Sequence, residues 1–239
     1  MRYLVFNSKG GCGKSTLTRE VIAAPFGKDI TIIEIDELNK TQEPYSERFN
    51  SVIELRKDEI KDLLIHLNEH DNAVIDVGTD NLSATLQTMV EYMLFDDIDK
   101  VIIPMGHGRS DSENALKTYN AISKHCDNVM FSFTLNTEEP LESQYPVFFS
   151  NVEKFIKGFS EKDYVTIHQS DVFLDAQHSR KLVLELAEDI DHKSAALTAK
   201  SEGDLEKFRE LMQQELNKRA AQILVKDCIM PAHKKITKA

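Results

Sequence analysis

The segment between residues 10 and 16, GGCGKST, combines three glycines, a lysine and two hydroxyl residues. Glycine tolerates backbone conformations that turn successive N–H groups toward one centre, where they bind an anion. Lys14 would bring its ammonium group to the β- and γ-phosphates of a nucleotide, Ser15 would ligate Mg²⁺, and Thr16 would lie near the α-phosphate. The glycines of the loop are Gly10, Gly11 and Gly13. The spacing therefore predicts a phosphate-binding loop.

A loop of this kind needs a strand before it and a helix after it. Residues 2–7, RYLVFN, form a short apolar run that predicts a buried strand. Residues 15–24 predict a helix that ends at Pro25 and Gly27. The N-terminus of this helix would add the positive end of its dipole to the anion site. The sequence on both sides of the loop thus supports the prediction.

A second lysine, Lys9, stands in front of the glycines. The arrangement K-G-G-x-G-K-[ST] resembles the deviant Walker A loop of the ParA/MinD superfamily of dimerising ATPases, which includes plasmid-partitioning ParA, MinD and StbB-type proteins. The resemblance implies that Lys9 reaches across an ATP-bound homodimer to phosphates held by the other subunit, where a second cation offsets charge developing during phosphoryl transfer. Cys12, at the variable position, would contribute only its backbone.

The second predicted strand, residues 29–36, ends in two carboxylates, Glu34 and Asp36. Proteins of the ParA/MinD superfamily usually carry two aspartates here, so the resemblance implies that Asp36 orients the attacking water and that Glu34 replaces the first aspartate. The Pro-Gln pair that usually follows is absent. The residues in its place are Glu37, Leu38 and Asn39.

Two further strand ends fit the resemblance. NAVIDVG, residues 72–78, matches a Walker B strand, so Asp76 would hold Mg²⁺ through water and Gly78 would let the backbone approach the γ-phosphate. FSFTLN ends in Asn136, where relatives place an asparagine against the adenine edge. A lone asparagine at a strand end is also a common turn residue, and that alternative stays open.

Strands and helices alternate along most of the chain, which indicates a mainly parallel sheet with helices on both faces. We expect an α/β, doubly wound P-loop NTPase core over residues 1–190, followed by a helical extension over residues 191–239 that packs on the core. The predicted strands cover residues 2–7, 29–36, 72–78, 99–105, 127–136 and 163–170. The predicted helices cover residues 15–24, 51–70, 81–94, 110–125 and most of the chain beyond 178.

The composition is that of an ordinary acidic protein of 239 residues with a net charge of −11, which argues against a surface that is basic all over. Residues 204–239 are mildly basic, with eight Lys or Arg and five Asp or Glu. The three cysteines form no CxxC pair, which indicates a reducing compartment without a zinc site. Together with the lack of a signal-peptide pattern, this predicts a cytoplasmic protein that could associate with the nucleoid.

The leading hypothesis is a Mg²⁺-dependent ATPase that dimerises with ATP and acts in plasmid or DNA segregation through a small DNA-binding adaptor. Nonspecific DNA is a possible further partner. One alternative is a metabolic P-loop enzyme, such as an ATP-dependent ligase or kinase. Another is a MinD-like positioning ATPase on a membrane, which is less favoured because Pro231 interrupts the C-terminal tail and few bulky apolar residues follow it.

Overall fold

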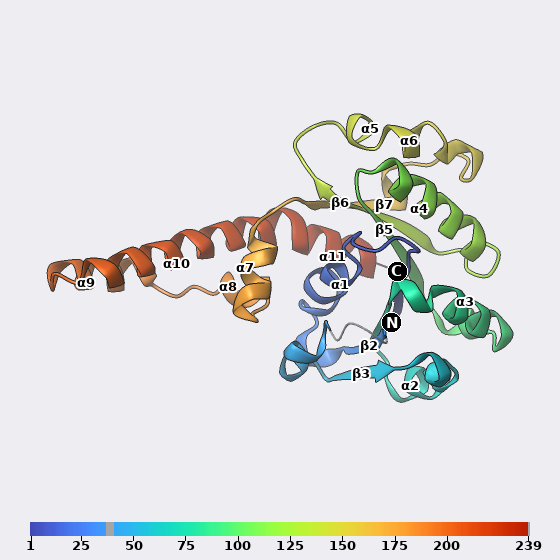
Figure 1. Ribbon diagram of the computed structural model, residues 1–239, viewed down its shortest axis with the longest axis horizontal. Coiled ribbons are helices and arrows are strands. Elements are labelled where there is room, and N and C mark those ends of the chain that lie inside the picture. The colour runs from blue at the N-terminus through green and yellow to red at the C-terminus, as the bar shows by residue number, and fades with distance from the viewer. Residues whose placement is uncertain (37–40, 239) are drawn as a thin grey trace.

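The computed structural model describes residues 1–36 and 41–238, and these residues include a seven-stranded parallel sheet (Figure 1). The strand order is β3-β2-β4-β1-β5-β6-β7, and each neighbouring pair is parallel. The strands are β1 (Arg2–Val5), β2 (Thr31–Ile35), β3 (Ser51–Leu55), β4 (Ala73–Val77), β5 (Lys100–Met105), β6 (Val129–Asn136) and β7 (Tyr164–His168). Because the order reverses on either side of β1, the loops beside its carboxyl end form a crevice suited to a ligand.

Alternate residues of each strand belong to two hydrophobic cores, one on each face of the sheet. In β1 and just after it, Leu4 and Phe6 join one core, whereas Tyr3 and Val5 join the other. The first core is covered by α2 (Leu63–Glu69), α3 (Leu82–Glu91), α4 (Arg109–Ile122) and α6 (Pro146–Phe149). The second is covered by the helix formed by α1 (Lys14–Thr16) and η1 (Leu17–Ala23), by α7 (Val172–Ser179) and α8 (Val183–Leu186), and by the C-terminal helices. This is the predicted doubly wound architecture.

The edge strand β3 differs from the sequence prediction, which placed residues 51–55 in the first turn of a helix. These residues pair in parallel with β2, from Thr31 opposite Ser51 to Ile35 opposite Leu55. The helical spacing of apolar residues holds only farther along, in the 3₁₀ turn η4 (Lys57–Asp62) and in α2. The prediction was wrong here because β-branched residues at 52 and 53 favour a strand when an unpaired edge is available.

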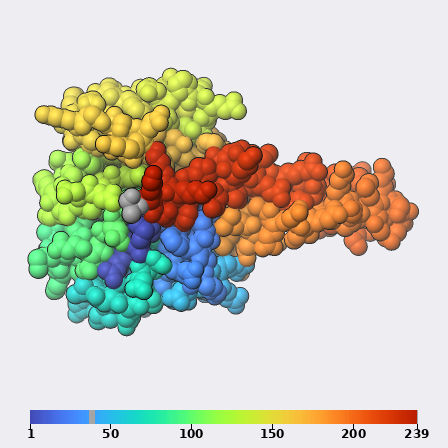
Figure 2. All heavy atoms as spheres, turned by 180° about the vertical axis from the view of Figure 1, so that it is seen from behind, coloured from blue at the N-terminus to red at the C-terminus, as the bar shows by residue number. Residues whose placement is uncertain are grey.

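A helical arm extends from the core (Figures 1 and 2). It is formed by α9 (His192–Ser201) and by the distal part of α10 (Leu205–Leu224), which pack against each other. The helix continues through η9 (Val225–Ile229) into α11 (Met230–Thr237), which returns to β7 and η1. The predicted boundary between the core and the helical extension, at residue 190, stays a prediction. Within the described ranges, no helix is long and apolar enough to cross a membrane.

The lysine-rich tail, residues 231–238, lies in and just after the folded helix α11. Its residues Ala232 and Ile236 are buried in the second core. The ammonium group of Lys235 lies 5.1 Å from the centre of the Tyr164 ring, and burial lowers the pKa of this lysine. Lys100, from β5, donates hydrogen bonds to the carbonyls of Ile236 at 2.7 Å and Lys238 at 3.0 Å. The tail therefore belongs structurally to the domain.

Candidate nucleotide-binding site

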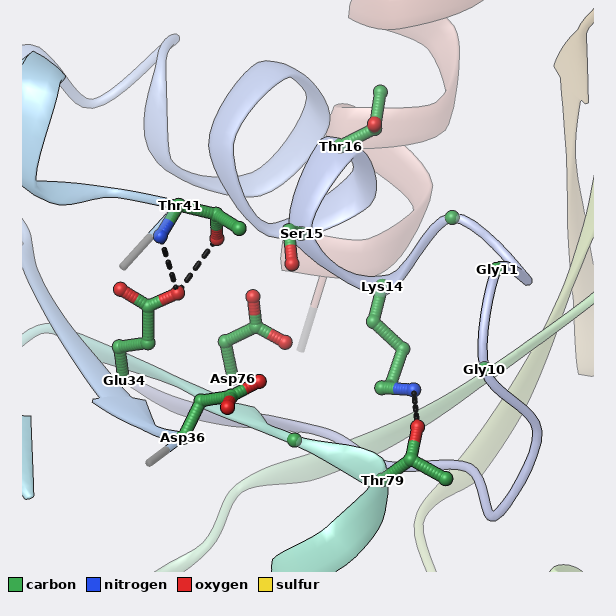
Figure 3. A pocket seen from close by; sticks show the side chains of 12 residues that line it. Gly10, Gly11, Lys14, Ser15, Thr16, Glu34, Asp36, Thr41, Asp76 and Thr79 are labelled. Atoms are coloured by element: carbon green, nitrogen blue, oxygen red, sulfur yellow. Dashed lines mark hydrogen bonds between the residues drawn. The ribbon is translucent and has the colours of Figure 1, made fainter. Parts of the chain in front are cut away.

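The predicted phosphate loop joins β1 to α1 and borders a cavity of about 380 Å³ (Figure 3). Gly11 and Gly13 have φ angles of 73° and 84°, in the left-handed region that side chains disfavour. A Cβ atom on Gly13 would also lie 3.3 Å from the Cγ2 atom of Thr134. The cavity is lined by Gly10, Gly11, Gly13, Lys14, Ser15, Thr16, Glu34, Asp36, Thr41, Asp76, Gly78 and Thr79. Most of the residues predicted from the motifs are thus brought to one cavity.

Lys14 is held with its ammonium group at this cavity. Its side chain donates hydrogen bonds to the hydroxyl of Thr79 and to the carbonyl of Lys9, both at 3.1 Å (Figure 3 shows the first). Lys14 is only 8% exposed, and polar partners of this kind are needed to keep a buried cation in place. Thr79, in the turn η5 (Thr79–Asn81) after β4, was not predicted, since a threonine in a loop carries no distinctive sequence signal.

Lys9 is placed differently from Lys14. Its carbonyl accepts hydrogen bonds from Lys14 and from the thiol of Cys12, at 3.1 Å and 3.0 Å, while its side chain is not among those lining the cavity. Cys12 is buried, and burial raises the pKa of its thiol. The thiol of Cys12 thus also bonds the loop backbone, whereas the predicted role of this residue, through its backbone alone, stays a prediction.

Asp76 ends in the cavity opposite the start of α1 (Figure 3). Its carboxylate accepts a hydrogen bond from the amide nitrogen of Gln42 at 3.2 Å and lies beside the side chain of Ser15. Burial raises the pKa of Asp76, whereas these polar neighbours and the charge of Lys14 act against that effect. Ser15 and Asp76, the two predicted metal-binding residues, are therefore adjacent.

Glu34 anchors the chain where it returns to the cavity after β2. One carboxylate oxygen accepts from the backbone N–H and the hydroxyl of Thr41, at 2.9 Å and 2.6 Å (Figure 3). The other accepts from the backbone N–H of Gln42 at 3.2 Å. Burial raises the pKa of Glu34, and the hydrogen bonds from Thr41 oppose this. The substitution of glutamate for the usual aspartate thus supplies a longer tether, which sequence reasoning did not predict.

Asp36 lies against Gly78, which follows β4. A Cβ atom added to Gly78 would be 2.5 Å from one carboxylate oxygen of Asp36 and 3.0 Å from its Cβ. The absence of a side chain at Gly78 is therefore what allows Asp36 to occupy this position. Glu37, Leu38 and Asn39 stand where proteins of the ParA/MinD superfamily usually carry Pro-Gln. These three residues lie outside the part of the chain that the structure describes.

A second cavity, of about 300 Å³, adjoins the loop on its other side. It shares Gly11, Gly13 and Thr16 with the first cavity. It is otherwise formed by Leu17, by the carboxyl ends of β6 and β7, and by the residues that follow β7 into α7. Its apolar walls suit the flat ring of a nucleobase. The residues that complete it are Leu17, Thr134, Leu135, Ile167, His168, Gln169, Ser170, Asp171, Phe173 and Leu174.

Asn136 does not line either cavity. Its side-chain oxygen accepts a hydrogen bond from the amide of Gln144 at 2.9 Å. The preceding residue, Leu135, has a φ angle of 62°, and the β6–β7 pairing is irregular between Phe133 and Asn136. The role of Asn136 at the adenine edge stays a prediction, and it would require the side chain to leave Gln144.

The donor set at Ser15 and Asp76 fits Mg²⁺, which prefers oxygen ligands and retains several waters. The carboxylate of Asp76 and the hydroxyl of Ser15 are oxygen donors, and the side-chain oxygen of the neighbouring Gln42 is buried without a hydrogen-bond partner among the described residues. Within the same residues, no group of three or more His, Cys, Asp or Glu side chains could enclose a metal. A metal here would therefore depend on ligands from a nucleotide and water.

Comparison with known proteins shows the fold. Neither a protein-family profile nor a curated protein matches the sequence. Among solved structures, apo McdA from Cyanothece superposes with a TM-score of 0.55 at 12% identity, covering 89% of this chain and 98% of McdA. MinD from Aquifex aeolicus superposes with a TM-score of 0.52 at 13% identity, and the match covers 89% of this chain and 96% of MinD. The Mg-ADP complex of MinD from Pyrococcus horikoshii superposes with a TM-score of 0.51 at 13% identity, and the match covers 76% of this chain and 86% of that MinD. The architecture is that of MinD and McdA.

Proposed function

We propose that this chain is an ATP-dependent, dimerising ATPase of the ParA/MinD type. The observation that carries the proposal is the different placement of the two lysines of the loop. Lys14 is buried at the phosphate cavity, whereas the side chain of Lys9 lies outside the cavity lining. One cation is thus available to a nucleotide bound by the same chain, and the other is available to a nucleotide across an interface. The Mg-ADP bound by P. horikoshii MinD, which has the same fold, supports this class of ligand.

The residues at the cavity would have different roles in phosphoryl transfer. Lys14 and the loop N–H groups would bind the phosphates, and Ser15 and Asp76 would hold Mg²⁺, which supplies charge stabilisation when bound. Asp36 lines the cavity and would orient the attacking water. Lys9 of one subunit would stabilise charge on the phosphates of the other, so that hydrolysis depends on dimerisation.

For the cellular role, we propose positioning of DNA through a separate DNA-binding adaptor. MinD from Aquifex aeolicus, a cell division protein, has the same fold. Candidate contacts to DNA phosphates are Lys234, Lys235 and Lys238, in and just after α11. Phosphate contacts release counterions, so the affinity for DNA should fall as the salt concentration rises. The apolar face of α11 already packs into the second core. This favours the DNA-linked role over membrane insertion of the C-terminal helix.

The test uses Lys9→Ala and Asp36→Ala, with Lys28→Ala as the control. Lys28 is an exposed lysine in η2 (Gly27–Asp29), before β2. We expect Lys9→Ala to bind ATP almost as well as the unaltered protein, to stay monomeric with Mg²⁺ and ATP, and to lose most hydrolysis. Asp36→Ala should bind ATP and accumulate as a dimer. Light scattering after gel filtration and phosphate release measure these outcomes.

Mixing the two variants tests action between subunits. In a mixed dimer, the site on the Lys9→Ala chain keeps its own Asp36 and receives the intact Lys9 of its partner. Partial recovery of hydrolysis in the mixture would support the proposal. Normal dimerisation and turnover by Lys9→Ala alone would contradict it and would favour a metabolic P-loop enzyme, whose turnover needs a small-molecule substrate instead of a protein or DNA partner.

A further inference from the structure

Gln42 is a buried polar residue at the nucleotide site to which neither the motifs nor the proposed chemistry assigns a role. It is fully buried, with 0% of its surface exposed. It stands just before the 3₁₀ turn η3 (Glu43–Arg48), and its backbone N–H donates to Glu34 at 3.2 Å. The backbone of Gln42 is therefore fixed from one side by the carboxylate that ends β2.

The side-chain amide of Gln42 joins two parts of the site. Its nitrogen donates to the carboxylate of Asp76 and to the backbone carbonyl of Ser15, both at 3.2 Å. A glutamine amide has two N–H donors, and here both have acceptors. Gln42 thus connects the predicted Walker B carboxylate to the first turn of the helix that follows the phosphate loop.

The side-chain oxygen of Gln42 is buried and has no hydrogen-bond partner among the described residues. Leaving a buried acceptor unsatisfied destabilises a protein. Turning the amide over would not relieve this, because its oxygen would then face the carboxylate of Asp76 and the carbonyl of Ser15, which are both acceptors. The two acceptors of its nitrogen therefore fix the orientation of the amide.

We propose that Gln42 is a positioning residue for the Mg²⁺–nucleotide complex. Its amide nitrogen holds the Asp76 carboxylate and the Ser15 backbone together, and so fixes the two residues that would hold the metal. This inference rests on the proposed function, because it concerns the same site. It adds a specific expectation, namely that Gln42 strengthens nucleotide binding only when Mg²⁺ is present.

The experiment measures the affinity of a fluorescent ADP analogue by anisotropy, once with saturating Mg²⁺ and once with EDTA. Gln42→Leu removes the amide at similar volume. We expect it to reduce the Mg²⁺-dependent gain in affinity by roughly tenfold or more, as loss of an outer partner of a metal ligand commonly does, and to leave the affinity in EDTA within about twofold. Gln213→Leu is the control, because Gln213 is exposed on α10, where its amide donates to Asn217.

Several outcomes would overturn the inference. An unchanged Mg²⁺-dependent gain in Gln42→Leu would contradict it, and so would an equal loss of affinity in Mg²⁺ and in EDTA, which indicates a purely structural role. Thermal unfolding checks that the variant folds. Should it not fold, Gln42→Asn decides the question, since it keeps a buried amide that is too short to span the same partners. If the unaltered protein bound no nucleotide under either condition, the proposed function itself would fail.

Discussion

The two cavities beside the phosphate loop share Gly11, Gly13 and Thr16 but differ in almost everything else. The larger cavity is bordered by charged side chains that are hydrogen-bonded to neighbouring hydroxyl groups, such as Lys14 to Thr79 and Glu34 to Thr41. The smaller cavity is bordered by apolar side chains such as Leu17, Ile167 and Phe173, together with exposed residues at the ends of β6 and β7. One half of the site is a network of hydrogen-bonded charged and polar groups, and the other half is a surface that suits the flat ring of a nucleobase.

This difference predicts how binding energy is distributed. Charged hydrogen-bonded groups in a low-dielectric site each contribute strongly, and removing one leaves its partners uncompensated. Apolar walls contribute in proportion to the area they cover, so the loss of one wall costs little. Substitutions at the larger cavity should therefore change affinity or turnover far more than substitutions at the smaller one.

The largest effect is expected for Lys14→Ala. The triphosphate would lose the only lysine side chain among the residues lining the larger cavity, and affinity for ATP should fall by at least about a hundredfold. Isothermal calorimetry measures this. Lys28→Ala, an exposed lysine, is the control. Unchanged ATP affinity in Lys14→Ala would contradict the assignment of the whole loop.

A large effect on turnover, with a smaller one on binding, is expected for Gly78→Ala. The new methyl group would lie 2.5 Å from a carboxylate oxygen of Asp36, so Asp36 must move. We expect hydrolysis to fall by roughly tenfold or more, with ATP affinity changed by less than about threefold. Gly106→Ala is the control, because the corresponding Cβ meets Asp111 at an ordinary 3.5 Å. Equal turnover in both variants would contradict the idea that Asp36 depends on the absence of a side chain at Gly78.

A modest effect is expected for Leu174→Ala, in the smaller cavity. Leu174 is 54% exposed, so truncation should leave folding intact and should weaken ATP and ADP binding by roughly fivefold. Pyrophosphate has no base, and its affinity should not change. Leu197→Ala, at a leucine of similar exposure on α9, is the control. A loss of pyrophosphate affinity in Leu174→Ala would show that this cavity does not hold the base.

The smallest effect is expected for Asn136→Ala, because the side chain is engaged by Gln144 and lies outside both cavity linings. Affinity for ATP should change by less than about twofold. Competition between ATP and GTP in the same assay shows whether base selectivity changes. A tenfold loss confined to adenine nucleotides would instead confirm the role at the adenine edge that the sequence predicts.

Sequence patterns predicted the parts of the site that local chemistry determines. The glycines, Lys14 and Ser15 follow one another in the chain, so their spacing alone specifies a phosphate loop. The resemblance to the ParA/MinD superfamily implied the positions of Asp36 and Asp76. Both line the cavity because the carboxyl ends of neighbouring parallel strands meet at one edge of the sheet. The same reasoning gave the doubly wound fold and six of its strands.

The parts that were missed depend on contacts between distant segments. Gln42 and Thr79 are ordinary loop residues in the sequence, and only the folded chain brings them to Asp76 and Lys14. Likewise β3 is a strand because β2 offers it an edge, whereas the apolar spacing downstream favoured a helix. Tertiary pairing overrode local propensity in this segment.

The contact of Lys100 with α11 has a consequence for synthesis on the ribosome. Lys100 is buried, and its bond to the carbonyl of Ile236 spans 136 residues of sequence. At about 5–20 residues per second, the ribosome supplies that carbonyl roughly 7–27 s after it has added Lys100. During this delay the ammonium group must stay hydrated, since burying it without a partner is costly. We therefore expect the nascent sheet to remain open beside β5, and available to chaperones, until α11 has been made.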